Sequence, residues 1–347
     1  MMIRDVLIKG SFALMAIAPL AGDSQNVASR TISGSIISLS ALKHPGTINV
    51  FPDYNLIIIG DAGASFGTPV YHVYSMDSVK FIRSFMALGL GKNEVSSPAD
   101  IQYFPKKRTI AFFDVNMQRY SLVSIDSVKS AKSVVNVIDY LGTKTPLVRP
   151  LKKVDQKLSR PLFLYRSQTI IDFNPDPIVP LNLLAVHNST GNFIKHAGVI
   201  TFITEAVDLG DQDGPFSGNL ALSDNEQHIV YTSFRKNLIC LFDSNGRLSA
   251  SYKGSPDMIR NQENATLVDG TTLAYTCRST RMKNKSVFAI NANPGNKAVT
   301  NMYIFNEKLI PQERLMINPG IFNFDVDAKA RKIYALNTKK ELIILSY

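Results

Sequence analysis

The stretch that most constrains the fold runs from Asn219 to Gly254 and reads NLALSDNEQHIVYTSFRKNLICLFDSNGRLSASYKG. It divides into four short β-rich runs, separated by turn clusters at Ser223–Glu226, Arg235-Lys236 and Asp243–Gly246. The last cluster ends in a glycine, which tolerates the positive φ of a hairpin turn. Four antiparallel strands in about 35 residues, with no helix between them, have the size of one β-propeller blade.

The same unit recurs along the chain. Residues 100–114 (DIQYFPKKRTIAFFD), 220–234 (LALSDNEQHIVYTSF) and 323–337 (NFDVDAKARKIYALN) each give a strand, a polar turn and an apolar strand. Turn residues recur throughout, and no long stretch has the apolar spacing of a helix. Recurrence at roughly 40 to 60 residues predicts five to seven blades, of which six fits best. We therefore expect an all-β, six-bladed propeller of four-stranded antiparallel blades.

The two ends of the chain predict how the ring closes. The last unit provides only three strands after Phe322, whereas the alternating segment Thr31–Ser40 has no partner nearby in the sequence. A ring leaves no blade edge unpaired if these two segments pair with each other. We expect one propeller domain over residues 31–347, closed by pairing the N-terminal strand with the last blade.

The first 22 residues have the pattern of a secretory signal peptide. Arg4 and Lys9 precede the apolar run Ser11–Leu20, which is too short to span a bilayer. Export to the periplasm or the cell surface is therefore expected. Leu20-Ala21-Gly22 also matches the start of a bacterial lipobox, but Asp23 stands where the lipid-bearing cysteine belongs. Membrane association is expected only with a lipid anchor, and Asp23 argues against one.

Composition and motifs limit the kinds of ligand that the chain is expected to bind. The net charge is +10, but the cations are scattered and the chain has no tryptophan, so no nucleic-acid platform is expected. Cys240 and Cys277 lie in strand-like runs and are interpreted as buried apolar residues. Gly89-Leu90-Gly91 is interpreted as a blade connector, because no helix follows as a phosphate loop requires.

Sequence motifs for a metal site or a serine nucleophile are incomplete or absent. The segment DLGDQDG at 208–214 (from Asp208) lacks the spacing of a calcium loop, so an Asp-rich turn is expected there. The five histidines fall in separate units, and no G-x-S-x-G motif occurs. We expect no metal, no cofactor and no catalytic residue, although a carboxylate pair assembled in space is invisible in the sequence.

Three segments resemble a known family. The succession SIISLSALKHPGTINVFPDYNLIIIGD, YHVYSMDSVKFIRSF and GLGKNEVSSPADIQYFPKKRTIAFFD is similar to the TolB-like six-bladed propellers of Bacteroidales. That family follows a strand ending in Ser-Phe with a Gly-x-Gly-Pro-Gly-Glu-like connector, whereas Lys92-Asn93 replaces Pro-Gly in this chain. The resemblance covers roughly residues 31–347. It implies an exported protein, often a lipoprotein, and it implies no catalytic residue.

One face of such a ring is predicted to be basic. Loops between the second and third strands of a blade share a face with the connectors between blades. The basic residues expected on that face are Arg119, Arg235, Lys236, Arg278, Arg281, Lys283 and Lys339. Clustered Arg and Lys attract anionic ligands, and Arg makes bidentate contacts with carboxylate or phosphate.

Two functions remain from the sequence. The first is a non-enzymatic binding or scaffold propeller of the bacterial cell envelope, which engages a protein or glycan, with anionic groups favoured, through one face. The alternative is a propeller hydrolase or lyase that acts on glycans at the central channel. Fold alone does not decide between them.

Overall fold

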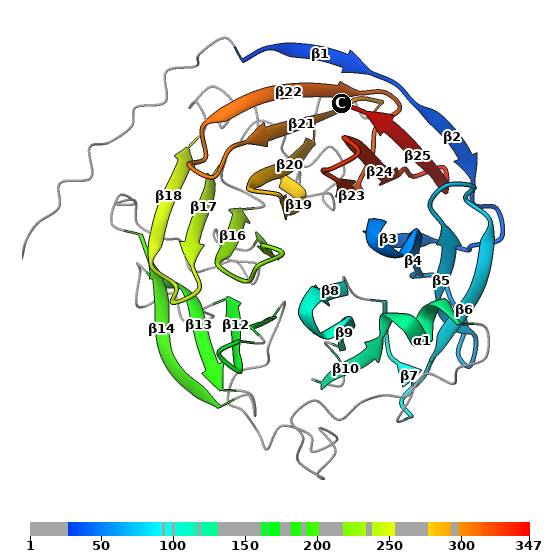
Figure 1. The fold of residues 1–347 in the computed structure, drawn as a ribbon, viewed down its shortest axis with the longest axis horizontal. Helices are drawn as coiled ribbons and strands as arrows, with labels where there is room; N and C mark the ends of the chain where they lie inside the picture. Colours follow the sequence, from blue (N-terminus) through cyan, green and yellow to red (C-terminus); the bar gives the residue numbers. More distant parts are fainter. Residues whose placement is uncertain are drawn as a thin grey trace, which may run out of the picture.

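The chain folds into a ring of six small β-sheets (Figure 1). The computed structural model describes residues 27–91, 94–98, 101–114, 116, 119–130, 161–164, 166–173, 182–188, 192–200, 218–233, 238–253, 277–292 and 298–347. Each sheet has one strand near the central axis and its other strands successively nearer the periphery. This is a six-bladed β-propeller, and the predicted fold class is confirmed.

The blades are numbered in chain order and described from the inner strand outward. Blade 1 contains β3 (Pro45–Phe51), β4 (Leu56–Asp61), β5 (Pro69–Ser75), β6 (Phe81–Leu88) and β7 (Glu94–Val95). Blade 2 contains, in its described part, β8 (Ile101–Phe104), β9 (Thr109–Asp114) and β10 (Arg119–Ser124). Blade 3 contains β11 (Leu162–Leu164), β12 (Thr169–Phe173), β13 (Asn182–Asn188) and β14 (Phe193–Val199).

The remaining blades follow the same plan. Blade 4 contains β15 (Gly218–Leu222), β16 (His228–Ser233), β17 (Leu238–Asp243) and β18 (Leu248–Lys253). Blade 5 contains β19 (Cys277–Lys283), β20 (Ser286–Ala292), β21 (Thr300–Phe305) and β22 (Pro311–Ile317). Blade 6 contains β23 (Asn323–Asp327), β24 (Lys332–Leu336) and β25 (Glu341–Ser346). Three short helices are described: η1 (Pro52–Tyr54), η2 (Pro105–Lys107) and α1 (Ile125–Lys129).

The sequence prediction of individual hairpins is confirmed. The stretch 219–254 forms the four antiparallel strands β15 to β18 of blade 4. The three segments aligned from the sequence form the hairpins β8–β9, β15–β16 and β23–β24, each the inner pair of its blade. The segment 87–98 connects blades 1 and 2, as expected for the two glycines Gly89 and Gly91.

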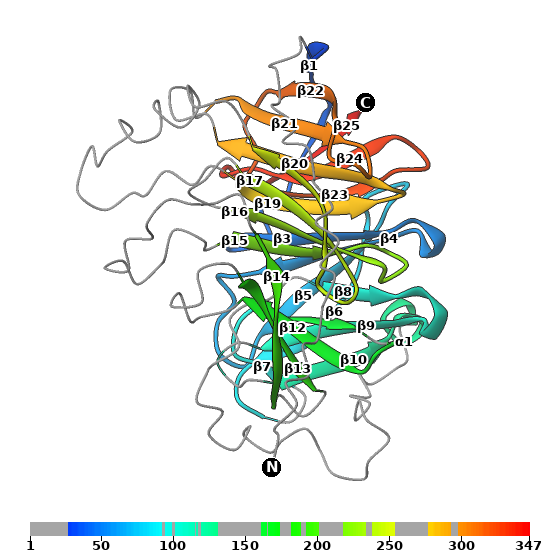
Figure 2. The same cartoon turned by 90° about the vertical axis from the view of Figure 1, so that its left-hand side faces the viewer.

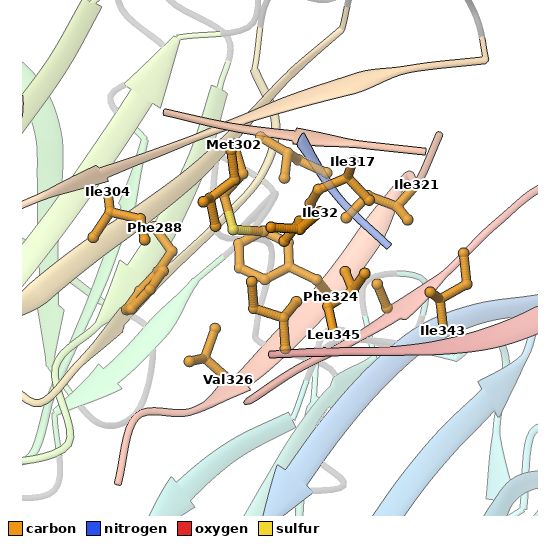
Figure 3. Close-up of a cluster of buried hydrophobic side chains, with 14 residues drawn as sticks. Ile32, Phe288, Met302, Ile304, Ile317, Ile321, Phe324, Val326, Ile343 and Leu345 are labelled. Carbon is orange, nitrogen blue, oxygen red and sulfur yellow. The ribbon is translucent and has the colours of Figure 1, made fainter. Parts of the chain in front are cut away.

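Each second strand is apolar on both faces because it lies between two neighbouring blades. In β4, Leu56 and Ile58 pack toward blade 2, whereas Ile57 and Ile59 pack toward blade 6. Six hydrophobic clusters result, one at each junction between consecutive blades. Figure 3 shows the cluster between blades 5 and 6, where Phe288 and Phe324 are buried. Burial at about 25 cal/mol per Å² of apolar surface makes these junctions the main source of stability.

The six inner hairpins share a backbone conformation although the residue types at the shared position differ. Each of the six turns between a first and a second strand contains a non-glycine residue with positive φ. These residues are Asn55, Arg108, Gln168, Glu226, Lys285 and Arg331, with φ between 51° and 64°. A left-handed residue reverses the chain tightly at this point. The repeat is therefore encoded in backbone conformation and not in one residue type.

Ring closure follows the prediction with one correction. The strand β2 (Ser35–Ser38) pairs antiparallel with β25 and completes blade 6, as expected. The prediction of one continuous strand over Thr31–Ser40 is wrong. The preceding residues form β1 (Ser29–Ile32), which pairs in parallel with β22 of blade 5. The N-terminal segment therefore joins two blades, and Ile32 is buried in the cluster between them (Figure 3).

The turns and connectors define two faces of the ring. We call the face formed by loops between second and third strands and by blade connectors the connector face. On it, the Ala62 amide donates to the His44 carbonyl and the Gly67 amide donates to the Leu88 carbonyl, both at 2.8 Å. The other, the hairpin face, carries the remaining turns, and Figure 2 shows the β3–β4 and β8–β9 hairpins pointing to this side. Within the described part of the chain, no helix has the length and apolar content to cross a membrane.

Candidate functional site

A charged cluster lies on the inner strands of blades 5 and 6, and we call it the inner-strand cluster. It consists of Arg281 and Lys283 on β19, Asp325 on β23, and Asp224 in the turn between β15 and β16. Alternation along β19 places Arg281 and Lys283 on the same side of the strand. The cluster thus brings together residues from three consecutive blades.

Asp325 is the buried anion of the cluster, with 3% of its side chain exposed. Its Oδ2 accepts a hydrogen bond from the Val50 amide of blade 1 at 2.8 Å, and its Oδ1 accepts one from the Val326 amide at 2.9 Å. The same Oδ1 lies 3.8 Å from Arg281 Nε and 3.8 Å from Lys283 Nζ. One carboxylate therefore links blades 5, 6 and 1 at the point where the ring closes.

The two cations differ in how they are held. The Arg281 guanidinium donates to the Thr280 carbonyl at 3.0 Å and to Asn323 Oδ1 at 3.3 Å, and lies over the Phe324 ring. Lys283 Nζ lies 3.4 Å from Asp224 Oδ1. Burial alone would lower the pKa of Lys283, but the two carboxylates outweigh burial and raise the pKa above its ordinary value. Lys283 is therefore charged at neutral pH.

The geometry of the inner-strand cluster is better suited to binding an anion than to catalysis. Both ion-pair distances to Asp325 are 3.8 Å, longer than the roughly 2.7–2.9 Å of a charge-assisted hydrogen bond. The side chains of Arg281 and Lys283 retain 14% and 23% exposure. Among the residues that the structure describes, no group of His, Cys, Asp and Glu is arranged to bind a metal ion.

Five of the seven predicted basic residues lie in the described part of the chain, at different positions along their strands and loops. Arg119 begins β10 and Arg278 is the second residue of β19, so both lie at the connector-face ends of their strands. Arg281 and Lys283 lie further along β19, toward the hairpin face. Arg235 and Lys236 fall outside the described residues.

The remaining basic residues lie on two opposite faces of the ring. Lys339 lies exposed in the connector-face loop between β24 and β25, as expected. Three further basic residues, Lys106, Lys107 and Arg108, are exposed on the hairpin face and were not predicted as a site. The proline-initiated turn at 105–108 was visible in the sequence, but its orientation in the ring was not.

The carboxylates at the ends of two second strands have a structural role. Asp61 accepts hydrogen bonds from the backbone amides of Lys43 (2.8 Å), His44 (2.7 Å) and Gly63 (2.9 Å). Asp114 in blade 2 accepts one from the Ser96 amide at 2.6 Å. Each carboxylate therefore fixes the connector that leads into its own blade. Such fully engaged carboxylates are poor candidates for general acid–base chemistry.

Replacing Asp61 with Asn is expected to destabilise the protein by about 1–3 kcal/mol at about pH 7. Burial raises the Asp61 pKa, but the amide donors of His44, Lys43 and Gly63 outweigh it and hold the pKa below its ordinary value. Because its folded-state pKa is lowered, Asp61 stabilises the folded protein fully at pH values above its unfolded pKa of about 3.9. This stabilisation is lost as pH falls through the folded-state pKa. Urea unfolding should therefore show the gap between wild type and Asp61→Asn shrinking by about pH 3. An equal gap at both pH values, or an equal loss in the exposed control Asp53→Asn, would contradict this assignment.

The remaining candidates of the sequence analysis do not converge. The expectation that the five histidines fall in separate units is wrong for His187 and His196, which lie on neighbouring strands of blade 3. His72 Nδ1 lies 2.9 Å from Ser84 Oγ in blade 1. Cys240 is buried in β17, as expected, and burial raises the pKa of its thiol. The Asp-rich segment 208–214, the segment 1–22 and the side chain of Cys277 lie outside what the structure describes.

Comparison with known proteins identifies the fold. No protein-family model matches the chain, and no curated protein sequence matches it. A predicted exported protein of Bacteroides fragilis has a similar structure, with a TM-score of 0.51 at 10% identity over 92% of this chain and 97% of that chain. The Cps50 (Swd1) β-propeller domain of Myceliophteria thermophila gives a TM-score of 0.50 at 8% identity over 91% and 99% of the two chains. At such identities the similarity shows the propeller fold alone, so function has to be argued from this chain's own residues.

Proposed function

We propose that the protein is a non-enzymatic binding propeller of the bacterial cell envelope that engages an anionic group of a protein or glycan. The observation that carries the proposal is the inner-strand cluster, in which two fixed cations approach one buried carboxylate at 3.8 Å each. A ligand carboxylate, sulfate or phosphate would gain shorter contacts to the same cations. Arg278 belongs to the same inner strand, β19, and lies nearer its connector-face end.

Placement in the cell envelope rests on the N-terminal sequence. The signal-like segment 1–22 supports export, and so does the resemblance to the TolB-like propellers of Bacteroidales. The structural neighbour from Bacteroides fragilis agrees with this placement, since it too is predicted to be exported. Four of the five buried aspartates in the described residues, Asp61, Asp114, Asp325 and Asp327, accept backbone hydrogen bonds, which favours a binding role over catalysis.

The test is direct binding to acidic oligosaccharides and acidic peptides, measured by calorimetry with wild type and single variants. Arg278→Ala, Arg235→Ala and Arg281→Lys are each expected to weaken binding by about tenfold, because a charged hydrogen-bond donor is lost or misplaced. The control is Lys308→Ala, which removes an exposed cation from the β21–β22 turn. Unchanged affinity in the three arginine variants, or no binding to any acidic ligand, would refute the proposal. Shortening of the oligosaccharide would instead establish the enzyme alternative.

A further inference from the structure

Two large apolar side chains project from the connector face of blade 1. Phe66 is 77% exposed and Leu90 is 70% exposed, the two highest values among large hydrophobic residues in the described part of the chain. Phe66 lies in the loop between β4 and β5, and Leu90 follows β6 in the connector to blade 2. Exposure of this extent in neighbouring loops marks a contact surface.

Backbone contacts hold these two loops together. Phe66 forms a parallel β-bridge with Leu88, and the Gly67 amide donates to the Leu88 carbonyl at 2.8 Å. The Leu90 loop is fixed at its base, where the Gly89 amide donates to the Val95 carbonyl at 2.9 Å. Backbone pairing therefore joins the Phe66 loop to the residues that immediately precede Leu90.

Cations continue this surface toward blade 6. Lys43 Nζ contacts Ser65 Oγ at 2.5 Å, next to Phe66 in the sequence. The Leu39 amide donates to the Lys340 carbonyl at 2.9 Å, which joins this connector to the loop that carries Lys339. Both Lys43 and Lys339 are exposed. We call the surface formed by Phe66, Leu90, Lys43 and Lys339 the apolar–basic rim.

The acidic residues of the same loops are engaged in internal hydrogen bonds. Asp61 accepts the backbone amides described above, and Glu94 Oε2 accepts the Gly91 amide at 2.6 Å. Glu341 Oε2 accepts Asn337 Nδ2 at 2.6 Å. The rim therefore presents apolar and positive groups to solvent, whereas the carboxylates of its loops accept hydrogen bonds within the protein.

We propose that the apolar–basic rim docks the protein on an anionic lipid bilayer without a lipid anchor. Exposed Phe and Leu side chains can insert at the boundary between lipid headgroups and acyl chains, while Lys contacts anionic headgroups. The net charge of +10 attracts the whole molecule to such a surface. Two inserted side chains and two lysines give weak, reversible binding. Lys43 and Lys339 differ from Arg235, Arg278, Arg281 and Lys283, to which we assign the soluble ligand, so either proposal can fail without the other.

The test is sedimentation of the protein with phosphatidylglycerol–phosphatidylethanolamine vesicles and with phosphatidylcholine vesicles. Wild type is expected to partition to the anionic vesicles at least about tenfold more strongly, and less strongly in high salt. The double variant Phe66→Ser/Leu90→Ser should lose at least about tenfold in partitioning. At matched ionic strength, inorganic phosphate and soluble glycerol phosphate should not displace the protein, because they offer no apolar phase.

The matched control is Phe81→Ser/Ile310→Ser, which removes one aromatic and one aliphatic side chain that are 57% and 44% exposed elsewhere on the ring. It should bind vesicles as wild type does. An equal loss in the control, full displacement by soluble phosphate, or no vesicle binding by wild type would overturn the proposal. All four replaced residues are exposed, and melting temperatures near that of wild type would confirm that both double variants fold.

Discussion

Replacing Gly34 with Val is expected to lower the stability of the ring by roughly 2–3 kcal/mol, which corresponds to a fall in Tm of several degrees. Gly34 lies between β1 and β2, where the N-terminal segment crosses from blade 5 to blade 6. A Cβ at this position would lie 1.9 Å from the Ile344 carbonyl oxygen and 2.7 Å from its carbon. Both atoms belong to the backbone of β25, so the crossing segment itself would have to move.

Movement of that segment would disturb two blades at once. β2 completes blade 6 through its register with Ile344 and its neighbours, and β1 covers the outer edge of β22. Ile32, buried at 6% exposure between the two blades, would be drawn out of the cluster shown in Figure 3. The loss should appear both in thermal unfolding and as faster hydrogen exchange of the Ser35–Ser38 amides.

Ser33→Val is the control for this prediction. It adds the same side chain to an exposed neighbour of Gly34 in the same segment. If Gly34→Val and Ser33→Val have equal Tm values and equal exchange rates, the close approach to β25 does not determine ring closure.

The sequence predicted those parts of the fold that depend on local signals. Blade 4 was recognisable because its strands are short and apolar and its last turn, DSNG, places Gly246 at a φ of 77°. The hairpins around 105–108 and 328–331 were recognisable from their polar turns. The number of blades followed from the spacing of such units.

What the sequence did not predict depends on residue variation or on distant contacts. The left-handed position of the inner turns is occupied by residues as different as Asn55, Arg108 and Glu226, so no repeat motif marks it. The parallel pairing of β1 has almost no side-chain signal, because Ile32 is the only buried residue of that strand. The ion pair between Arg281 and Asp325 was not predicted, because Asp325 lies in the next blade and sequence spacing does not reveal such a contact.

Asp325→Ala is expected to destabilise the protein by about 3–5 kcal/mol, because breaking a buried ion pair leaves its partners uncompensated. The substitution removes the acceptor of the Val50 amide and the buried anion that faces Arg281 and Lys283. Asp224, which also faces Lys283, is 51% exposed, so Asp224→Ala should cost no more than about 1 kcal/mol. Denaturant unfolding at fixed pH measures both losses.

A double variant distinguishes loss of the charge from loss of packing. Adding Lys283→Met to Asp325→Ala removes one of the two cations left without their buried anion, so the double variant should be more stable than Asp325→Ala alone. The cluster also predicts an alkaline limit. Because the folded-state pKa of Lys283 is raised, its stabilising effect is complete below the unfolded pKa of about 10.4 and is lost as pH rises through the folded value. If Asp325→Ala and Asp224→Ala cost the same, or if Lys283→Met makes Asp325→Ala less stable, the cluster does not join the blades through charge.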